Sequence, residues 1–208
     1  MKAANIIFPH QLFENSPIAE NGSPVYLLEE TLYFNQFAFH KQKIAFHRAT
    51  MKWYAAFLES KKVEVIYIES ANPLSDLRRL VADLKSKSIA RIHYIDPTDD
   101  WLGKRLASAA AKANIEIIEY SNPLFLNSKE DLSVFFQEKK KKFFQTAFYI
   151  QERKKRKILV NDQSEPVGGA WSYDVDNRKK YPRTKRPPHI DYPATSEFYE
   201  EAKTYVQE

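Results

Sequence analysis

The sequence of 208 residues contains no cysteine. This absence excludes disulfide bonds, thiolate catalysis, a cysteine-ligated zinc site and an iron–sulfur cluster held by this chain itself. Glycine is also scarce, with four residues. Neither the G-x-G-x-x-G pattern of dinucleotide-binding loops nor the G-x-x-x-x-G-K-[ST] phosphate-binding loop is present, and the G-x-S-x-G elbow is missing too. A dinucleotide bound in the usual way is therefore not expected.

Long apolar runs are missing as well. No stretch approaches the roughly 18 apolar residues that a membrane-spanning helix needs. The short apolar run after the first residues stops at His10, so we expect no signal peptide. Together with the absent cysteines, this indicates a cytoplasmic protein with no membrane partner.

The net charge of +5 is unevenly distributed along the chain. Residues 1–137 hold 16 basic and 16 acidic side chains and are neutral. Residues 138–186 hold 15 basic and 6 acidic side chains, whereas residues 187–208 hold 1 basic and 5 acidic ones. The basic character therefore belongs to one segment, which indicates an anionic partner or a solvated face at that place.

Short apolar runs alternate with helical patterns in the first part of the chain. The predicted strands are Asn5–Phe8, Val25–Leu28, Val63–Ile68, Arg91–Ile95 and Ile115–Tyr120. Each is almost continuously apolar, as strands covered on both faces are. The predicted helices are Lys41–Glu59 with an apolar stripe of Ile44, Met51, Ala55 and Leu58, a helix opened by Asn72-Pro73, and Trp101–Ala113 capped by Asp99 or Asp100. The alternation predicts a doubly wound, Rossmann-like α/β fold with a five-stranded parallel sheet and helices on both faces.

The pattern changes after Tyr120. Ser128 marks a helix start, and residues 138–157 form an aromatic and basic helical segment. Residues 161–195 contain 5 prolines and no periodicity, and a further helix begins at Ser196. We therefore predict an α/β domain over 1–137, a helical and extended basic arm over 138–195, and the start of a truncated helix over 196–208.

The carboxyl ends of the predicted strands carry polar residues where ligands bind in doubly wound folds. The loop after the first strand contributes Phe8, Pro9, His10, Gln11 and Leu12, and Glu29 and Glu30 follow the second strand. Aromatic residues lie nearby in the sequence, which suits a flat heterocycle with polar edges. The alternative is that these polar groups satisfy loop backbone and that the aromatics are core.

Two further features have a functional and a structural interpretation. His40 and His47 lie near one helical face, but no carboxylate at matching spacing completes a metal site, so we interpret them as partly buried or capping residues near a pocket. The basic segment has two interpretations. In the first, its cations and aromatic rings contact nucleic acid or a neighbouring domain. In the second, its cations form a solvated face and its aromatic rings pack inward. The candidates are Lys139, Lys140, Arg153, Lys154, Trp171, Arg178, Lys179 and Lys180.

Several strings together resemble one family. These strings are Phe8-Pro9-His10-Gln11-Leu12, the stretch from Leu27 to Lys52 with its His40-Lys41-Gln42-Lys43 core, Asp96-Pro97, the Phe148–Lys154 stretch, and Gly168-Gly169-Ala170-Trp171-Ser172-Tyr173-Asp174 followed by Asn177-Arg178-Lys179-Lys180. They are similar to the deoxyribodipyrimidine photolyase-related proteins, the iron–sulfur bacterial branch of the photolyase–cryptochrome family of DNA repair flavoproteins.

The resemblance implies a role for each part. In that family an N-terminal α/β domain holds a ribityl-lumazine antenna chromophore, which passes excitation to FAD in a helical domain that repairs DNA as a lyase. Only the antenna domain and the arm match here, so the resemblance implies no FAD or iron–sulfur cluster in this chain and no catalytic residue. The implied chromophore-binding residues are Pro9, His10, Gln11, Glu29, Tyr33 and Ile44, to which we add Phe8, Leu12, Glu30 and His47 as neighbours.

Two alternatives stay open. The basic 138–186 segment indicates a nucleic-acid-binding module, with DNA as the partner. The acidic end and the helix from Ser196 instead suit one half of a split photolyase, which docks a separate FAD-binding helical domain.

Overall fold

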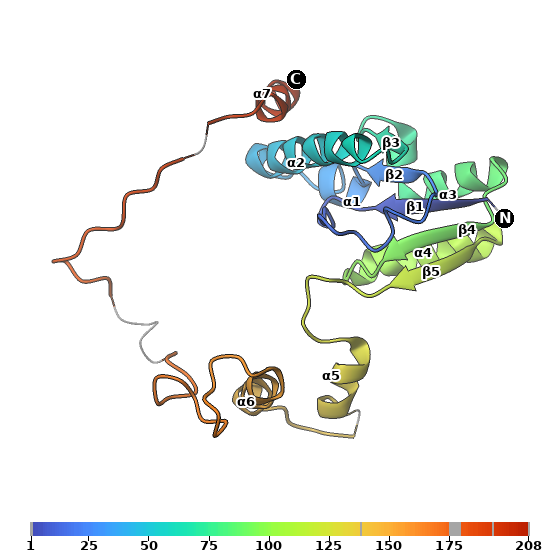
Figure 1. Cartoon of the computed structure of the whole chain (residues 1–208). Helices are drawn as coiled ribbons and strands as arrows, with labels where there is room; N and C mark the ends of the chain where they lie inside the picture. Colours follow the sequence, from blue (N-terminus) through green and yellow to red (C-terminus); the bar gives the residue numbers. More distant parts are fainter. Residues whose placement is uncertain (1, 138, 175–179, 193, 208) are drawn as a thin grey trace. The chain divides into compact units, whose positions relative to one another are not determined.

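The computed structural model describes residues 2–137, 139–174, 180–192 and 194–207. The chain forms two compact units (Figure 1). The first contains residues 1–124 and 193–208, and the second contains residues 125–192. Each unit is described by itself.

The first unit is built on a five-stranded sheet. Its strands are β1 (Ala3–Ile7), β2 (Val25–Leu28), β3 (Val65–Ile68), β4 (Arg91–Ile95) and β5 (Glu116–Tyr120). All neighbouring pairs are parallel, and the order is β3-β2-β1-β4-β5. The predicted doubly wound α/β fold is confirmed, and every strand lies within two residues of its predicted bounds.

Helices cover both faces of the sheet because successive strand side chains point to opposite sides. On one face Ala4, Ile6 and Phe8 pack with α3 (Leu77–Ser86) and α4 (Asp100–Ala113). On the other face Ile7, Val25 and Leu27 pack with α2 (Lys41–Ser60). The central strands β1 and β2 are thus buried on both sides, and Figure 1 shows helices on both faces of the sheet.

Side-chain caps fix where these helices begin. His40 caps α2 by accepting from the Gln42 N–H, which confirms its interpretation as a capping residue. Asp99, one of the two predicted candidates, caps α4, and Asp100 is the first residue of the helix. Asn72 caps only the 3₁₀ turn η1 (Pro73–Ser75), and Asp76 then caps α3. A short helix, α1 (Thr31–Phe34), was not predicted because four residues carry no periodic pattern.

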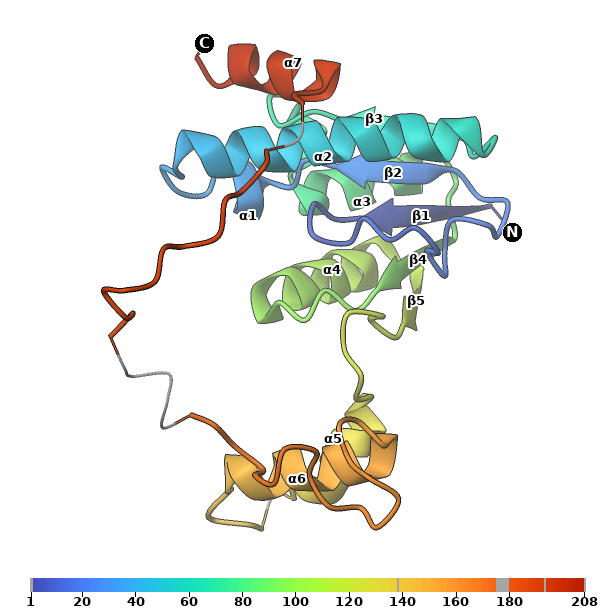
Figure 2. The same cartoon turned by 60° about the vertical axis from the view of Figure 1, so that its left-hand side comes forward.

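The last helix belongs to the first unit. α7 (Glu197–Tyr205) begins where its start was predicted, with Ser196 as its cap, and packs along α2 (Figure 2). Fully buried Ala202 contacts Ala45 and Ala49, whose small side chains allow the two helices to approach closely. Residues 194–196 and α7 thus return the chain to the α/β unit.

The second unit contains α5 (Lys129–Phe135) and α6 (Gln145–Arg156). Ser128 caps α5 in a reciprocal capping box with Asp131. Among the described residues of the arm from 158 onward, the β-pairing consists of one isolated bridge, Val160 to Pro166.

The prediction of a helix over residues 138–157 was wrong in its first half. Glu138 lies outside the described residues, and residues 139–144 are not helical. On a helix Lys139 and Lys142 would be neighbours at a spacing of three residues, where like charges repel. The chain instead turns so that Phe143 and Phe148 pack against Phe136, with ring centroids 5.1 Å from it in both cases.

Among the described residues, no helix is long and apolar enough to cross a membrane.

Leu80 provides a test of the packing between α3 and the sheet. Its side chain is fully buried, so Leu80→Ala leaves a cavity and should lower the free energy of unfolding by about 2–5 kcal/mol. The neighbouring Arg79 is exposed, and Arg79→Ala should stay within about 0.5 kcal/mol of the parent. Urea denaturation measures both values, and equal losses would contradict this packing.

Candidate functional site

The loops after β1 and β4 meet at the switch point of the sheet. β1 and β4 are neighbours, and the strand order reverses between them, which is where ligands bind in doubly wound folds. Gln11 Nε2 donates to the carbonyls of Ile95 (3.1 Å) and Asp96 (3.0 Å), and a ring nitrogen of His10, Nε2, lies 3.0 Å from the carbonyl oxygen of Pro97. These bonds hold the two loops together.

Two buried polar atoms in this loop have no hydrogen-bond partner among the described residues. They are Gln11 Oε1 and His10 Nδ1. Because His10 Nε2 donates to Pro97, Nδ1 is left as an acceptor. Buried polar atoms are normally satisfied, so these two acceptors indicate a place for a donor from a ligand or water.

Three rings from separate elements gather beside this loop. The His10 ring stacks on Tyr33, with centroids 5.1 Å apart and planes 17° from parallel. The His47 ring meets Tyr33 edge-on at 5.8 Å and lies 6.2 Å from Phe34. Burial lowers the pKa of both His10 and His47, and it raises the pKa of Tyr33. All three rings are therefore uncharged near neutral pH.

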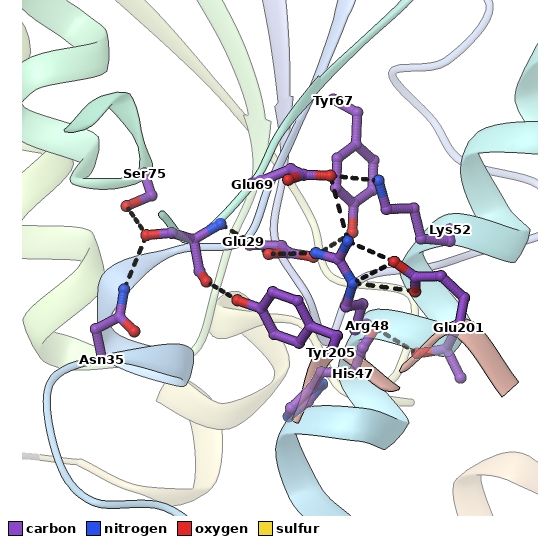
Figure 3. Close-up of polar contacts among 12 residues, drawn as sticks. Glu29, Asn35, His47, Arg48, Lys52, Tyr67, Glu69, Ser75, Glu201 and Tyr205 are labelled. Carbon is purple, nitrogen blue, oxygen red and sulfur yellow. Dashed lines mark hydrogen bonds and ion pairs between the residues drawn. The ribbon is translucent and has the colours of Figure 1, made fainter. Parts of the chain in front are cut away.

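The next residue of α2 after His47 is a buried arginine, Arg48, and Figure 3 shows its polar contacts. Arg48 is 5% exposed and points from α2 toward the ends of β2 and β3. It donates to Glu29 (3.1 Å) and to Glu201 of α7 (2.6 Å), and it reaches Glu69 at 3.3 Å. Burial alone would lower the pKa of Arg48, but the surrounding carboxylates raise it. The group therefore stays charged and ties three elements together.

Glu29 is fully occupied by protein donors. Its carboxylate accepts from Arg48, from the Tyr67 hydroxyl (2.6 Å) and from the backbone N–H of Ser70 (2.7 Å). Burial raises the pKa of Tyr67, so this hydroxyl keeps the proton that it donates. Glu29 thus has a structural role: it holds Arg48, Tyr67 and the Ser70 backbone together next to the site.

A cavity of about 390 Å³ opens next to this network. Its apolar lining comes from Phe34, Phe39, Ile44 and Val206, and its polar lining from Asn35, Lys41, Ser70 and Tyr205. The Ser70 and Tyr205 hydroxyls hydrogen-bond each other, and Asn35 Nδ2 donates to the Ser70 carbonyl at 2.9 Å. This volume lies in the range of small-molecule sites. Phe34 joins the cavity to the ring cluster, since it lines one and contacts the other.

The structure brings five of the ten residues predicted for the chromophore site to the ring cluster or the cavity, and it gives the other five different roles. His10, Tyr33 and His47 come together, Pro9 accepts a hydrogen bond from His47, and Ile44 lines the cavity. The other five lie around them. Gln11 joins the two loops, Glu29 binds Arg48, Phe8 and Leu12 are packed in the two core clusters, and Glu30 caps α1.

Sequence reasoning missed Arg48 and the lining from α7. Arg48 lies on the apolar stripe of its helix, three residues before Met51. A charge inside such a stripe needs a buried partner, and this signal was available in the sequence. Tyr205 and Val206 could not have been found, because helical periodicity does not reveal which helix covers which.

The predicted residues of the basic segment separate into two groups. Arg153 is buried and donates to the carbonyls of Ile158, Leu159 and Trp171, and Lys154 Nζ lies 5.2 Å from the centre of the Trp171 ring. Lys140 instead lies over the Phe135 ring at 4.1 Å, while Lys139 and Lys180 are exposed. Arg178 and Lys179 lie outside the described residues.

The Arg48 network makes a stability prediction. Arg48→Met should lower the free energy of unfolding by about 3–5 kcal/mol, because it leaves the buried Glu29 carboxylate without its cation. Lys52→Met is the matched control, since Lys52 pairs with the half-exposed Glu69 at 2.8 Å and should cost no more than about 1 kcal/mol. Chemical denaturation compares the two, and a similar small loss in both would refute the role of Arg48.

The two histidines predict a pH dependence. Their folded-state pKa values lie below 6.5, so the unfolded chain binds protons first as the pH falls. The contribution of the two neutral histidines to the free energy of unfolding is complete above about pH 6.5 and is lost as the pH drops below that value. The variant H10Q/H47Q should therefore lose less stability than the parent between about pH 7 and 5. The control H189Q, at an exposed ring, should keep the parent slope, and identical slopes in all three proteins would contradict this prediction.

Comparisons with known proteins identify relatives of this chain. The model of the deoxyribodipyrimidine photo-lyase-related protein family matches residues 5–208. An uncharacterized protein of Acanthamoeba polyphaga mimivirus is 36% identical over 192 residues, which cover 88% of this chain and 96% of that protein. A (6-4) photolyase of Agrobacterium fabrum is 28% identical over 157 residues, which cover 72% of this chain but 30% of that enzyme. The predicted resemblance is thereby confirmed, and the chain belongs to the deoxyribodipyrimidine photo-lyase-related protein family.

Proposed function

We propose that the first unit binds a planar heterocyclic antenna chromophore of the ribityl-lumazine class in the cavity beside Phe34. The observation that carries this proposal is the cavity of about 390 Å³ at the carboxyl edge of the sheet, next to an uncharged ring cluster. Membership in the photolyase-related family supports the choice of ligand class.

The lining fits a flat ring system with polar edges. Phe34, Phe39 and Ile44 supply apolar contact for the faces of a ring. Asn35 and Lys41 present hydrogen-bonding groups at the rim, where a ring carbonyl or a ribityl hydroxyl would find a partner. The bound group would supply absorption of light and transfer of that excitation to a flavin.

The protein groups around the cavity hold the site and exclude water. Tyr205 and Val206 place α7 over one side of it, and Arg48 keeps α7 there through Glu201. Neutral His10 and His47 keep the neighbouring ring cluster free of charge, so no imidazolium in that cluster must be desolvated when a ligand enters.

The partner that would receive the excitation is an FAD-binding helical domain, and we propose that the chain has no repair activity without it. The (6-4) photolyase is covered over 30% of its length, so most of that enzyme has no counterpart in this chain.

Titration with ribityl-lumazine tests the proposal. We expect a protected, shifted absorption band with a dissociation constant in the micromolar range. The variant I44W should bind at least tenfold more weakly because its indole fills the cavity, a loss of about 1.4 kcal/mol. Phe46→Trp on the exposed face of the same helix is the control and should bind like the parent.

Thermal unfolding of both variants shows whether they are folded. Because Ile44 is partly buried, a second variant, Lys41→Glu at the exposed rim, changes the site without changing the core. No binding by the parent at tens of micromolar, or equal binding by all variants, would refute the proposed antenna site.

A further inference from the structure

A second cavity, of about 360 Å³, lies within the second unit, between α6 and the loop that follows it. Tyr149, Trp171 and Tyr173 supply aromatic rings to its lining, and Thr146, Gln145 and Ser172 supply hydrogen-bonding groups. Tyr149 and Tyr173 are about half exposed, at 46% and 54%. Aromatic faces that line a cavity and remain accessible to solvent are suited to stacking with a flat ligand.

This cavity is held in shape by the protein itself. Buried Arg153 donates to the carbonyls of Ile158 (3.1 Å) and Trp171 (3.4 Å), and so fixes the loop against α6. The Tyr173 hydroxyl donates to the Gly168 carbonyl at 2.7 Å. Gly168 has φ +88°, a backbone conformation that favours glycine, and a Cβ there would lie 2.5 Å from that hydroxyl and displace it.

The lining contains one cation, Arg153, and one carboxylate, Asp174, whereas the segment around the cavity is strongly basic. Arg153 bonds to uncharged carbonyls, and among the described residues no carboxylate forms an ion pair with it or with Lys154. Lys154 Nζ lies 5.2 Å from the centre of the Trp171 ring, and the Arg153 guanidinium carbon lies 5.1 Å from it. The surrounding segment of residues 138–186 has 15 basic and 6 acidic side chains. A ligand that combines flat rings with many negative charges is therefore favoured.

Single-stranded nucleic acid has this chemistry. Its unpaired bases stack on aromatic side chains, whereas its phosphates bind lysine and arginine and release counterions. A duplex keeps its bases stacked inside and cannot offer one to a cavity. The polar groups of Gln145, Thr146 and Ser172 lie in the lining, where the edge of a base would meet them.

The geometry points to a binding site for one unstacked base of a single-stranded nucleic acid in the cavity formed by Tyr149, Trp171 and Tyr173. Lys154, which lies next to the Trp171 ring, contacts a phosphate beside that base. This site is separate from the chromophore cavity of the first unit, and neither depends on the other.

The test uses the whole chain and two fluorescent strands of about 15 nucleotides, which is near the upper end of the site sizes of single-strand-binding folds. One strand is oligothymidylate, and the other has the same backbone with abasic positions. At about 50 mM salt we expect oligothymidylate to bind with a dissociation constant below about 100 µM and to weaken steeply as salt rises. The abasic strand should bind at least fivefold more weakly, because it offers phosphates but no base.

Variants locate the site. Tyr149→Ala should weaken oligothymidylate binding at least fivefold and leave the abasic strand unaffected. Tyr192→Ala is the control, because Tyr192 is 84% exposed in the same unit and does not line the cavity. In the variant W53F/W101F, Trp171 is the remaining tryptophan of three, and its fluorescence should be quenched by oligothymidylate.

Equal affinity for the two strands would show binding by charge alone and overturn the base site. Absence of Trp171 quenching on binding would overturn it as well. Tyr149→Ala lies at a half-exposed position, and circular dichroism confirms that the variant is folded. Unchanged binding by folded Tyr149→Ala would likewise contradict the proposal.

Discussion

The guanidinium of Arg48 is the interaction on which the arrangement of the first unit depends. It connects α2 with Glu29 at the end of β2, with Glu69 after β3 and with Glu201 of α7. A buried charge is costly unless it is paired and hydrogen-bonded, so these partners cannot move away independently. The same group also lies over the Tyr205 ring, at 3.9 Å, which holds the end of α7 in place.

The proposed chromophore cavity follows from this constraint. Tyr205 and Val206 line it only because α7 is held on α2, and Ser70 lines it where its N–H binds Glu29. Small residues on α2 and α7 let the helices approach, but the pairing of Arg48 with Glu201 adds a directional contact that apolar packing lacks. The sequence feature that organises the site is thus an arginine in an otherwise apolar stripe.

Much of the fold was predictable from local patterns, and the site was predictable in part. Continuous apolar runs predicted all five strands, and Asp99 and Ser196 predicted two helix starts. The ring cluster of His10, Tyr33 and His47 has no such signature, because its members come from three separate segments. The contact of α7 with α2 depends on tertiary packing, and the non-helical stretch 139–144 reflects packing between phenylalanine rings and repulsion between lysines. The residue pattern within one segment does not predict contacts between segments that are far apart in the sequence.

The most direct measurement is a crystal structure of the chain grown with ribityl-lumazine. We expect the heterocycle in the cavity, with its ring faces against Phe34 and Phe39 and with α7 still docked through Arg48 and Glu201. A ligand bound elsewhere on the first unit, or a cavity that stays without ligand at saturating concentration, would contradict the proposed antenna site.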